Sequence, residues 1–341
     1  MSKKRITLKD ISKELNLAPS TISRALKDHP GISAKTKKIV KEKVDELGFT
    51  PDFIASSFRN KKTRSIGVIV PKINIHFHSL VISGIEECAY RSGYNVTIFQ
   101  SQDSYKREKE IIKILHNKMV EGIIVCLAME TNNYDHFKKL EKLKVPLVFY
   151  DRIPDDLEVN KVAINDFDSA FKATEHLIKI GCRRIAHIAG LQSTGIFRAR
   201  ANGYLAALKK YNLPIEPGLL LETKELSYAE GVACAKNFLA QPELPDGIFC
   251  ANDYTAVSVV QIFNKAHIKI PQELAVVGFS NYPISEIIEP HLSTINDRAF
   301  QMGQSATKLL ISQIEEENQD IIKSQSIILK TELIIRDSSR R

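Results

Sequence analysis

Residues 7–26 read TLKDISKELNLAPSTISRAL, and this stretch predicts two short helices joined by a tight turn. Thr7 can N-cap the first helix, in which leucine and isoleucine recur on one side. Asn16 interrupts that helix, and Pro19 stands near the first turn of the second helix, where a proline is well tolerated. Two short helices so close together belong to a small helical domain.

The second of these helices has two chemically different sides. Ile22 and Leu26 are spaced to share one side, whereas Ser20, Thr21 and Arg24 lie on the other. Small hydroxyl side chains and one arginine are poor core material. They suit the major groove of DNA, because small side chains allow close approach and arginine can bond guanine in bidentate fashion.

A third helix is expected from Ser33, as its N-cap, to Gly48, which ends it. Lysines cover its outer side, so an ordinary three-helix domain with a solvated face is the alternative interpretation. The charge distribution favours DNA binding. Residues 1–64 hold sixteen Lys and Arg against seven Asp and Glu, whereas the whole chain has a net charge of only +8. The basic excess therefore lies in the first fifth of the chain, as in a polyanion-binding head.

The segment TPDFIASSFRN (residues 50–60) follows the third helix. Pro51 should end the preceding structure, and Asp52 can cap a short helix from Phe53 to Arg59. Residues 61–65 (KKTRS) then form a charged linker.

From residue 66 onward, short apolar strands alternate with amphipathic helices. This alternation predicts parallel sheets covered by helices. About ten strands exceed one comfortable sheet, so we expect two lobes. Ligands of such sheets bind beyond the carboxyl ends of the strands, and two facing lobes would enclose a cleft that can close around a ligand.

The chain resembles the LacI/GalR (lactose-repressor) family of bacterial transcription regulators. The resemblance begins with ITLKDISKELNLAPSTISRAL and ISAKTKKIVKEKVDELGFTPD and continues through ATEHLIKIGCRRIAHIAG, RANGY, ANDYTAV and IPQELAVVGFSN to PHLSTI and LIIRDS. It implies an all-α helix-turn-helix head joined by a hinge helix to an α/β, two-lobe, periplasmic-binding-protein-like body. The implied divisions are head 1–50, hinge and linker 51–65, and body 66–341. Within the body, the N-lobe would be about 66–162 and 293–324, and the C-lobe about 163–290 and 325–341.

The resemblance also implies which residues contact DNA. In the family the segment after the third helix pairs with that of the dimer mate in the minor groove, where a central leucine acts as an apolar wedge. Phe58 stands at that position here, and packing of Phe58 under the head is the alternative. The expected DNA-binding residues are Thr7, Ser20, Thr21, Arg24, Ser33, Thr36, Ala55, Ser56, Phe58 and Arg59.

An effector site at the mouth of the cleft is implied in the same way. Carboxylates, amides and arginine forks at strand ends suit the hydroxyls of a polyol or the edge of a purine. Ser280 departs from the family, which commonly has Asp in the corresponding G-F-D-N stretch. The expected effector-binding residues are Phe77, His78, Asp151, Arg200, Asn252, Ser280 and Asn296, and for Asp253 we expect helix capping.

Other chemistries find little support in the sequence. His76 and His78 have no third metal ligand at a recognisable spacing, and the five cysteines are scattered without a CxxC pair, so neither a metal site nor a disulfide framework is expected. Residues 190–196 have P-loop spacing, but Ile196 replaces the required lysine. We therefore expect no catalysis and no cofactor. No apolar run approaches the ~18 residues that a membrane span needs. The N-terminal residues MSKKRITLKD contain no apolar stretch long enough for a signal peptide, so we expect a cytoplasmic protein.

The sequence thus predicts a homodimeric, sequence-specific DNA-binding regulator, a repressor, controlled by a small effector. Its expected partners are double-stranded operator DNA and a sugar or sugar derivative in preference to a purine, and a protein corepressor is a further partner that the resemblance admits. Two other classes remain as alternatives. One is a solute-binding receptor without a DNA function, and the other is a DNA recombinase with a helix-turn-helix head. Neither the effector's identity nor the operator follows from the sequence.

Overall fold

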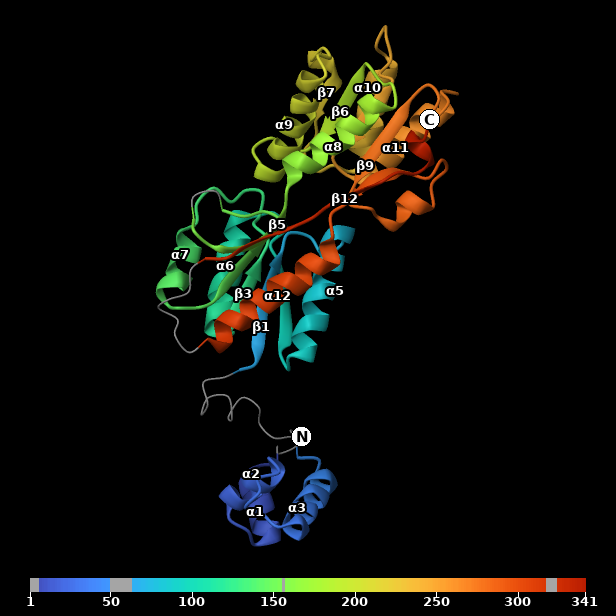
Figure 1. The fold of residues 1–341 in the computed structure, drawn as a ribbon. Coiled ribbons are helices and arrows are strands. Elements are labelled where there is room, and N and C mark those ends of the chain that lie inside the picture. Colours follow the sequence, from blue (N-terminus) through green and yellow to red (C-terminus); the bar gives the residue numbers. More distant parts are fainter. Residues whose placement is uncertain (1–5, 50–62, 155–156, 317–323) are drawn as a thin grey trace, which may run out of the picture. The chain divides into compact units, whose positions relative to one another are not determined.

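The computed structural model describes residues 6–49, 63–154, 157–316 and 324–341. The chain divides into two compact units, Met1–Thr63 and Arg64–Arg341, which we call the head and the body (Figure 1). No helix among the residues with assigned structure has both the length and the apolar character needed to cross a membrane.

The head is a bundle of the three helices predicted from the sequence: α1 (Leu8–Leu15), α2 (Pro19–Leu26) and α3 (Ala34–Leu47). Asn16 ends α1 with a left-handed backbone, and Gly48 ends α3 in the same conformation, which glycine adopts without steric cost. The buried core of the bundle consists of Ile11, Ile22, Ala25, Val40, Val44 and Phe49.

The body contains two six-stranded sheets. The N-lobe sheet has the order β11-β5-β4-β3-β1-β2, and the C-lobe sheet has the order β12-β10-β9-β8-β6-β7. All pairings are parallel except that of β10 with β12. The strands are β1 (Ser65–Val70), β2 (Asn95–Gln100), β3 (Gly122–Val125), β4 (Leu147–Tyr150), β5 (Asn160–Ile164), β6 (Ile185–Ala189), β7 (Leu220–Glu222), β8 (Gly247–Cys250), β9 (Ala275–Phe279), β10 (Ser293–Asn296), β11 (Ser326–Leu329) and β12 (Glu332–Ile334).

Helices cover both faces of each sheet, because alternate residues of every strand point to opposite faces. In β1, Val68 belongs to the core under α5 and α12, whereas Ile69 belongs to the core under α6 and α7. The helices of the body are α5 (His76–Arg91), α6 (Tyr105–Asn117), α7 (Asp135–Lys142), α8 (Asp166–Lys179), α9 (Gly195–Lys210), α10 (Tyr228–Leu239), α11 (Asp253–Lys265) and α12 (Ala299–Glu315), with short 3-10 turns at Pro217–Leu219, Pro283–Glu286 and Asp337–Ser339.

Helices α5 and α12 approach each other at two glycines. A Cβ atom added at Gly84 would lie 2.1 Å from the carbonyl oxygen of Phe300, and one added at Gly303 would lie 2.1 Å from that of Val81. Both positions therefore require glycine, since no side chain fits between the two backbones.

The lobes divide the chain differently from the expectation. Strand β10, which was placed in the N-lobe, pairs with β9 in the C-lobe sheet. The final strand, which was placed wholly in the C-lobe, splits around Lys330 and Thr331: β11 pairs with β5 of the N-lobe and β12 with β10 of the C-lobe. A run of apolar residues predicts a strand but does not say which neighbour it pairs with. The chain thus passes between the lobes at residue 165, at residues 297–298 and at residues 330–331.

Candidate functional site

One exposed polar surface lies on the second helix of the head. Ile22 and Ala25 of α2 are fully buried against the other two helices, so Ser20 and Arg24 on its other side face solvent. Thr21 is half-buried beside them. The short helix therefore presents two hydroxyls and a guanidinium from a fixed scaffold, as the sequence predicted.

Three other predicted DNA-binding residues lie at helix starts in the head. The Thr7 N–H and hydroxyl donate to the Asp10 carboxylate at 2.8 and 2.6 Å, which fixes the start of α1. The Ser33 hydroxyl accepts the Thr36 N–H at 3.2 Å and thereby caps α3. Ala55, Ser56, Phe58 and Arg59 lie outside the described residues.

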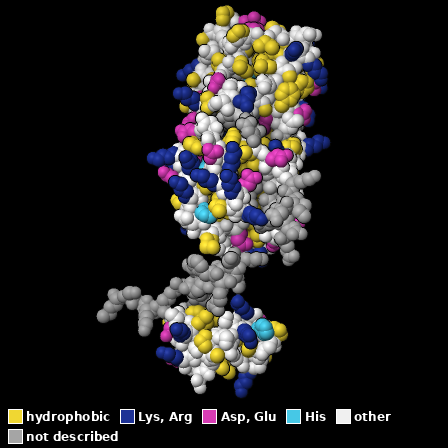
Figure 2. All heavy atoms as spheres, turned by 90° about the vertical axis from the view of Figure 1, so that its left-hand side faces the viewer, with side chains coloured by type: hydrophobic (Ala, Val, Ile, Leu, Met, Phe, Trp, Pro, Cys, Tyr) yellow, Lys and Arg dark blue, Asp and Glu magenta, His cyan; other side chains and the backbone are white. Residues whose placement is uncertain are grey.

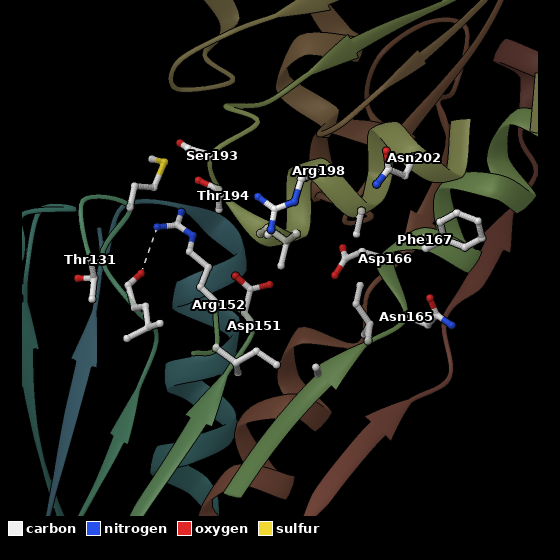
Figure 3. A pocket seen from close by; sticks show the side chains of 18 of the residues that line it. Thr131, Asp151, Arg152, Asn165, Asp166, Phe167, Ser193, Thr194, Arg198 and Asn202 are labelled. Atoms are coloured by element: carbon white, nitrogen blue, oxygen red, sulfur yellow. Dashed lines mark hydrogen bonds between the residues drawn. The ribbon is translucent and has the colours of Figure 1, made fainter. Parts of the chain in front are cut away.

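A cavity of about 540 Å³ lies in the body between the N-lobe and the C-lobe (Figure 3). Its walls come from the ends of β3, β4 and β5 and from the first turns of α8 and α9. This is the place where ligands of parallel sheets bind, beyond the carboxyl ends of the strands. The polar residues of its lining are Thr131, Asp151, Arg152, Asn165, Asp166, Ser193, Thr194, Arg198 and Asn202.

Two buried ion pairs stand at this cavity. Arg152 donates to the Asp103 carboxylate at 2.5 Å. On the C-lobe side, the Arg200 Nε donates to Asp166 at 2.8 Å, and its Nη1 donates to the Ala251 carbonyl at 2.8 Å. Arg200 is therefore not a lining residue itself but orients Asp166, which is.

Arg200 also lies over an aromatic ring. Its guanidinium carbon is 3.6 Å from the centroid of the Phe279 ring, a cation–π geometry. Burial raises the pKa of Asp166 to about 6, although the positive charge of Arg200 acts in the opposite direction. The pair is therefore a buried part of the C-lobe wall.

Asp151 is the one predicted effector residue that lines the cavity among the described residues. It follows β4 with a left-handed backbone, and it is 8% exposed. Burial raises the pKa of Asp151, while Arg152 and Arg200 lower it. A carboxylate held in this way can accept hydrogen bonds from ligand hydroxyls.

Phe77 and His78 do not line the cavity. Both residues were expected in a loop after β1, but helix α5 already begins at His76. Their side chains therefore lie in its first turn and are buried. The His78 Nδ1 is 3.4 Å from the Tyr150 hydroxyl, and the neighbouring His76 ring packs edge-on against Tyr282 of the C-lobe at 5.2 Å. Both predicted residues are therefore packed inside the fold and do not line the cavity.

The remaining predicted effector residues make structural contacts. Asn252, rather than Asp253, is the N-cap of α11: its side chain accepts the Thr255 N–H at 2.9 Å and donates to the Leu226 carbonyl at 2.8 Å. Ser280 is buried, with its N–H bonded to the Ile295 carbonyl.

Asn296 also serves the backbone, because its side chain accepts the Arg298 N–H at 3.0 Å. Asp253 is buried and accepts from the Tyr282 N–H and the Thr294 hydroxyl, both at 2.6 Å. Its expected role as a helix cap is therefore wrong, since its carboxylate instead ties α11 to β10.

Most polar residues of the cavity lining were not among the predicted effector-binding residues. Asn165 and Asp166 directly follow β5, so the rule of strand ends could have found them. Thr194, Arg198 and Asn202 lie on or beside the first turns of α9, and no local motif marks them. Their role depends on which strand ends meet at one edge of each lobe.

Known proteins resemble this chain along nearly its whole length. Residues 7–52 match the description "Bacterial regulatory proteins, lacI family", and residues 174–339 match "Periplasmic binding protein-like domain". The transcriptional repressor PurR of Pasteurella multocida is 28% identical over 97% of this chain and 98% of its own. Catabolite control protein A of Priestia megaterium is 28% identical over 92% of this chain and 94% of its own. The solved lac repressor dimer bound to operator and the anti-inducer ONPF has a TM-score of 0.88 at 23% identity, covering 98% of this chain and 99% of that one.

The chain belongs to the LacI family of bacterial regulatory proteins. Its head, its two-lobe body and their order along the chain are those of the family. This LacI-family protein is a DNA-binding transcription regulator, and the relatives named above are regulators rather than enzymes.

Proposed function

We infer that this LacI-family protein is a repressor that binds a two-fold symmetric operator as a homodimer. Its affinity for the operator changes when a small molecule binds in the interlobe cavity. The observation that carries this inference is the presence, in one chain, of an exposed Ser20–Arg24 surface on α2 and a polar cavity of about 540 Å³ between two lobes. One part can read DNA, and the other can bind a ligand.

Reading of the operator rests on α2. Ser20 and Thr21 are short enough to bring the helix close to the bases, and Arg24 can reach the N7 and O6 atoms of a guanine. One short helix makes few base contacts, so two heads and a pseudo-palindrome supply the specificity that a genome requires.

Outside the described residues, we assign Phe58 to the minor groove as an apolar wedge, with Ala55, Ser56 and Arg59 around it. The support is the Pro51-initiated segment and the position of Phe58 within it. An aromatic side chain can unstack a base step as an aliphatic one does.

Ligand binding in the cavity would affect DNA binding through the angle between the two lobes. The chain passes between them at three places, so a ligand that contacts both walls changes the angle between the lobes by favouring one arrangement. Asp151 comes from the N-lobe wall and Asp166 from the C-lobe wall. A polyol that bonds both carboxylates would hold the lobes closed.

Selection from randomised DNA tests the function. Full-length protein should enrich a two-fold symmetric sequence, and a mobility shift on that sequence should change when the effector is added. A protein that retards no DNA would be a solute receptor, and one that cuts or joins the selected DNA would be a recombinase. Either result would overturn the proposed function.

A further inference from the structure

Arg64 is the first residue of the body, at the point where the chain arrives from the head. Its backbone is left-handed, with a φ angle of 48°. An arginine in this conformation is uncommon, and such a conformation persists only where the surrounding structure holds it. The strain therefore points to contacts that keep this residue in place.

Both peptide groups of Arg64 are bonded within the N-lobe. Its N–H donates to the carboxylate of Glu121, the residue before β3. Its carbonyl oxygen accepts the Asn95 N–H at 2.8 Å, where β1 and β2 start to pair. The backbone of Arg64 is thus tied to two neighbouring strands at once, although β1 itself begins only at Ser65.

The side chain of Arg64 makes two further contacts. Its guanidinium carbon lies 4.9 Å from the centroid of the Tyr94 ring, which is a cation–π distance, and Tyr94 is buried. Its Nη1 is 3.6 Å from the Glu315 carboxylate. Burial raises the pKa of Tyr94, the carboxylates of Glu121 and Glu315 raise it further, and Arg64 lowers it. All four groups therefore lie within electrostatic reach of one another.

The contacts of Arg64 differ in weight. Arg64 and Glu315 are both more than a third exposed in their side chains, and an ion pair of this kind contributes little by itself. The bond to Glu121 is charge-assisted and half-buried, so it is the stronger of the two carboxylate contacts. We therefore expect the Glu121 bond and the Tyr94 ring to hold the residue, with Glu315 as a minor partner.

Glu315 connects Arg64 to a long helix. It is the last residue of α12, which begins beside the passage between the lobes at residues 297–298 and ends near the start of β1 (Figure 1). Between these ends, α12 meets the backbone of α5 at Gly84 and Gly303. Arg64 is thus joined both to the sheet of the N-lobe and to a helix that is packed against it.

We propose that Arg64 is a positioning residue, whose contacts with Glu121, Tyr94 and Glu315 fix the direction in which the chain leaves the body toward the head. In a dimer, two fixed exits restrict the separations that the two heads can span on DNA. This inference rests on the proposed function, because it concerns two heads on a two-fold operator. A residue that only completed the sheet would need neither side-chain contact.

Two linked heads bind DNA more tightly than one only while both can bind at once. The advantage of two linked modules can reach ~10²–10⁴-fold, and it is lost when geometry forbids joint binding. One base pair inserted between the half-sites moves them about 3.4 Å apart and rotates them by roughly 34–36°. Heads with a fixed exit cannot follow this change, whereas heads with a free exit can.

Operators with one or two base pairs inserted between the selected half-sites test the proposal. Full-length protein should bind them at least about tenfold more weakly than the selected operator, because part of the advantage of joint binding is lost. In Arg64→Gly, which loses the guanidinium and gains backbone freedom, the difference should shrink to about twofold. Glu121→Ala removes the acceptor of the Arg64 N–H and should act in the same direction. Arg64→Lys keeps a cation for Tyr94 and Glu315 and should resemble the parent.

Lys144→Gly is the matched control. Lys144 is another exposed cation with a left-handed backbone, at a φ angle of 55°, and it lies in the loop between α7 and β4. Its replacement should leave the response to inserted base pairs unchanged. Urea unfolding of the body and binding to a single half-site should be the same in the parent and in both glycine variants, since neither the core of the body nor the head is altered.

The outcomes separate this inference from the proposed function. A difference between selected and inserted operators that persists in Arg64→Gly and Glu121→Ala would overturn the inference, even if the body unfolds more easily. An equal change in Lys144→Gly would overturn it too, as would a parent that tolerates the inserted base pairs. If the parent selects no two-fold sequence from randomised DNA, the proposed function fails and this inference fails with it.

Discussion

Ser20 and Arg24 of the head lie one turn apart on a single helix and face solvent, whereas Asp151, Arg152 and Arg198 of the body come from different lobes and meet only in the fold. The head places its polar groups on a surface that needs three helices and a small core beneath it. The cavity needs two sheets in one arrangement. The contrast teaches that the proposed DNA-reading surface is a local property of the sequence, whereas the proposed ligand site is a property of tertiary structure.

Removal of the head should have the largest effect. Residues 64–341 should lose DNA binding altogether, because the basic excess of the chain lies in the part removed. They should still dimerise and bind ligand. Sedimentation at tens of micromolar checks the first point, since specific interfaces normally hold at ~10⁻⁶ M or tighter. A monomeric body would contradict the homodimer.

Gly84→Ala should destabilise the body and leave the stability of the head unchanged. The added Cβ would lie 2.1 Å from the Phe300 carbonyl oxygen, so α5 and α12 must move apart. The free energy of unfolding of the body should fall by about 3 kcal/mol. The head should keep its own unfolding transition. Calorimetry resolves both transitions, and Glu86→Ala on the exposed side of α5 is the control. An unchanged unfolding transition of the body would show that α5 and α12 can move apart without loss of stability.

The two regions also differ in how far the sequence alone could describe them. The three helices of the head follow from apolar spacing and from local signals at Thr7, Ser33 and Gly48, and all three are where they were expected. In the body, the alternation of strands and helices predicts two helix-covered sheets, but not that β10 and β12 pair in the C-lobe while β11 pairs in the N-lobe.

The same limit applies to the cavity. Asp151 could be predicted because it directly follows a strand, whereas His78 was misplaced because its helix starts one turn earlier than the pattern suggested. The meeting of Arg152 with Arg198 depends on the pairing of distant strands and on the angle between lobes, which no local pattern encodes.

Basic side chains on one face of the body are also visible in Figure 2, beyond the basic head that charge counting singled out.

Phe58→Ala should weaken operator binding without changing the cavity. Phe58 lies outside the described residues, and its proposed role as a minor-groove wedge predicts a loss of about 2–3 kcal/mol together with reduced DNA bending. Circular-permutation mobility measures the bend, and Phe58→Leu should restore both properties. If the head of Phe58→Ala unfolds while the folded fraction bends DNA normally, the packing alternative holds instead.

Arg24→Ala should relax specificity at one position of each half-site. The loss of a bidentate guanine contact costs about 1–3 kcal/mol at that position and leaves the rest of the operator unaffected. Selection on randomised half-sites measures it, with Lys27→Ala, an exposed cation just beyond α2, as the control. Recovery of the same consensus at the same stringency would show that Arg24 is no base reader.

Asp297→Asn should have the smallest effect on DNA binding, because its effect is confined to the stability of the body. Asp297 lies between β10 and α12, and one of its carboxylate oxygens is buried without a partner. Burial raises the pKa of Asp297 from 3.8 to about 7, while the hydrogen bond with Ser280 opposes the shift. The folded state therefore keeps a proton that the unfolded state releases, and the body loses stability as the pH rises from about 4 to about 7.

An asparagine at position 297 cannot ionise and thus removes this part of the pH dependence. The unfolding free energy of the Asp297→Asn body should fall less over that window, by up to about 4 kcal/mol, which is about 1.4 kcal/mol for each pH unit between the two pKa values. Asp253, whose pKa is raised by burial to about 7 as well, keeps a residual slope in the variant. Urea unfolding at several pH values measures the difference, with the exposed Asp135→Asn as the control. Identical slopes in Asp297→Asn and the parent would mean that the carboxylate is already ionised in the fold, and the operator affinity of the head should be the same in both.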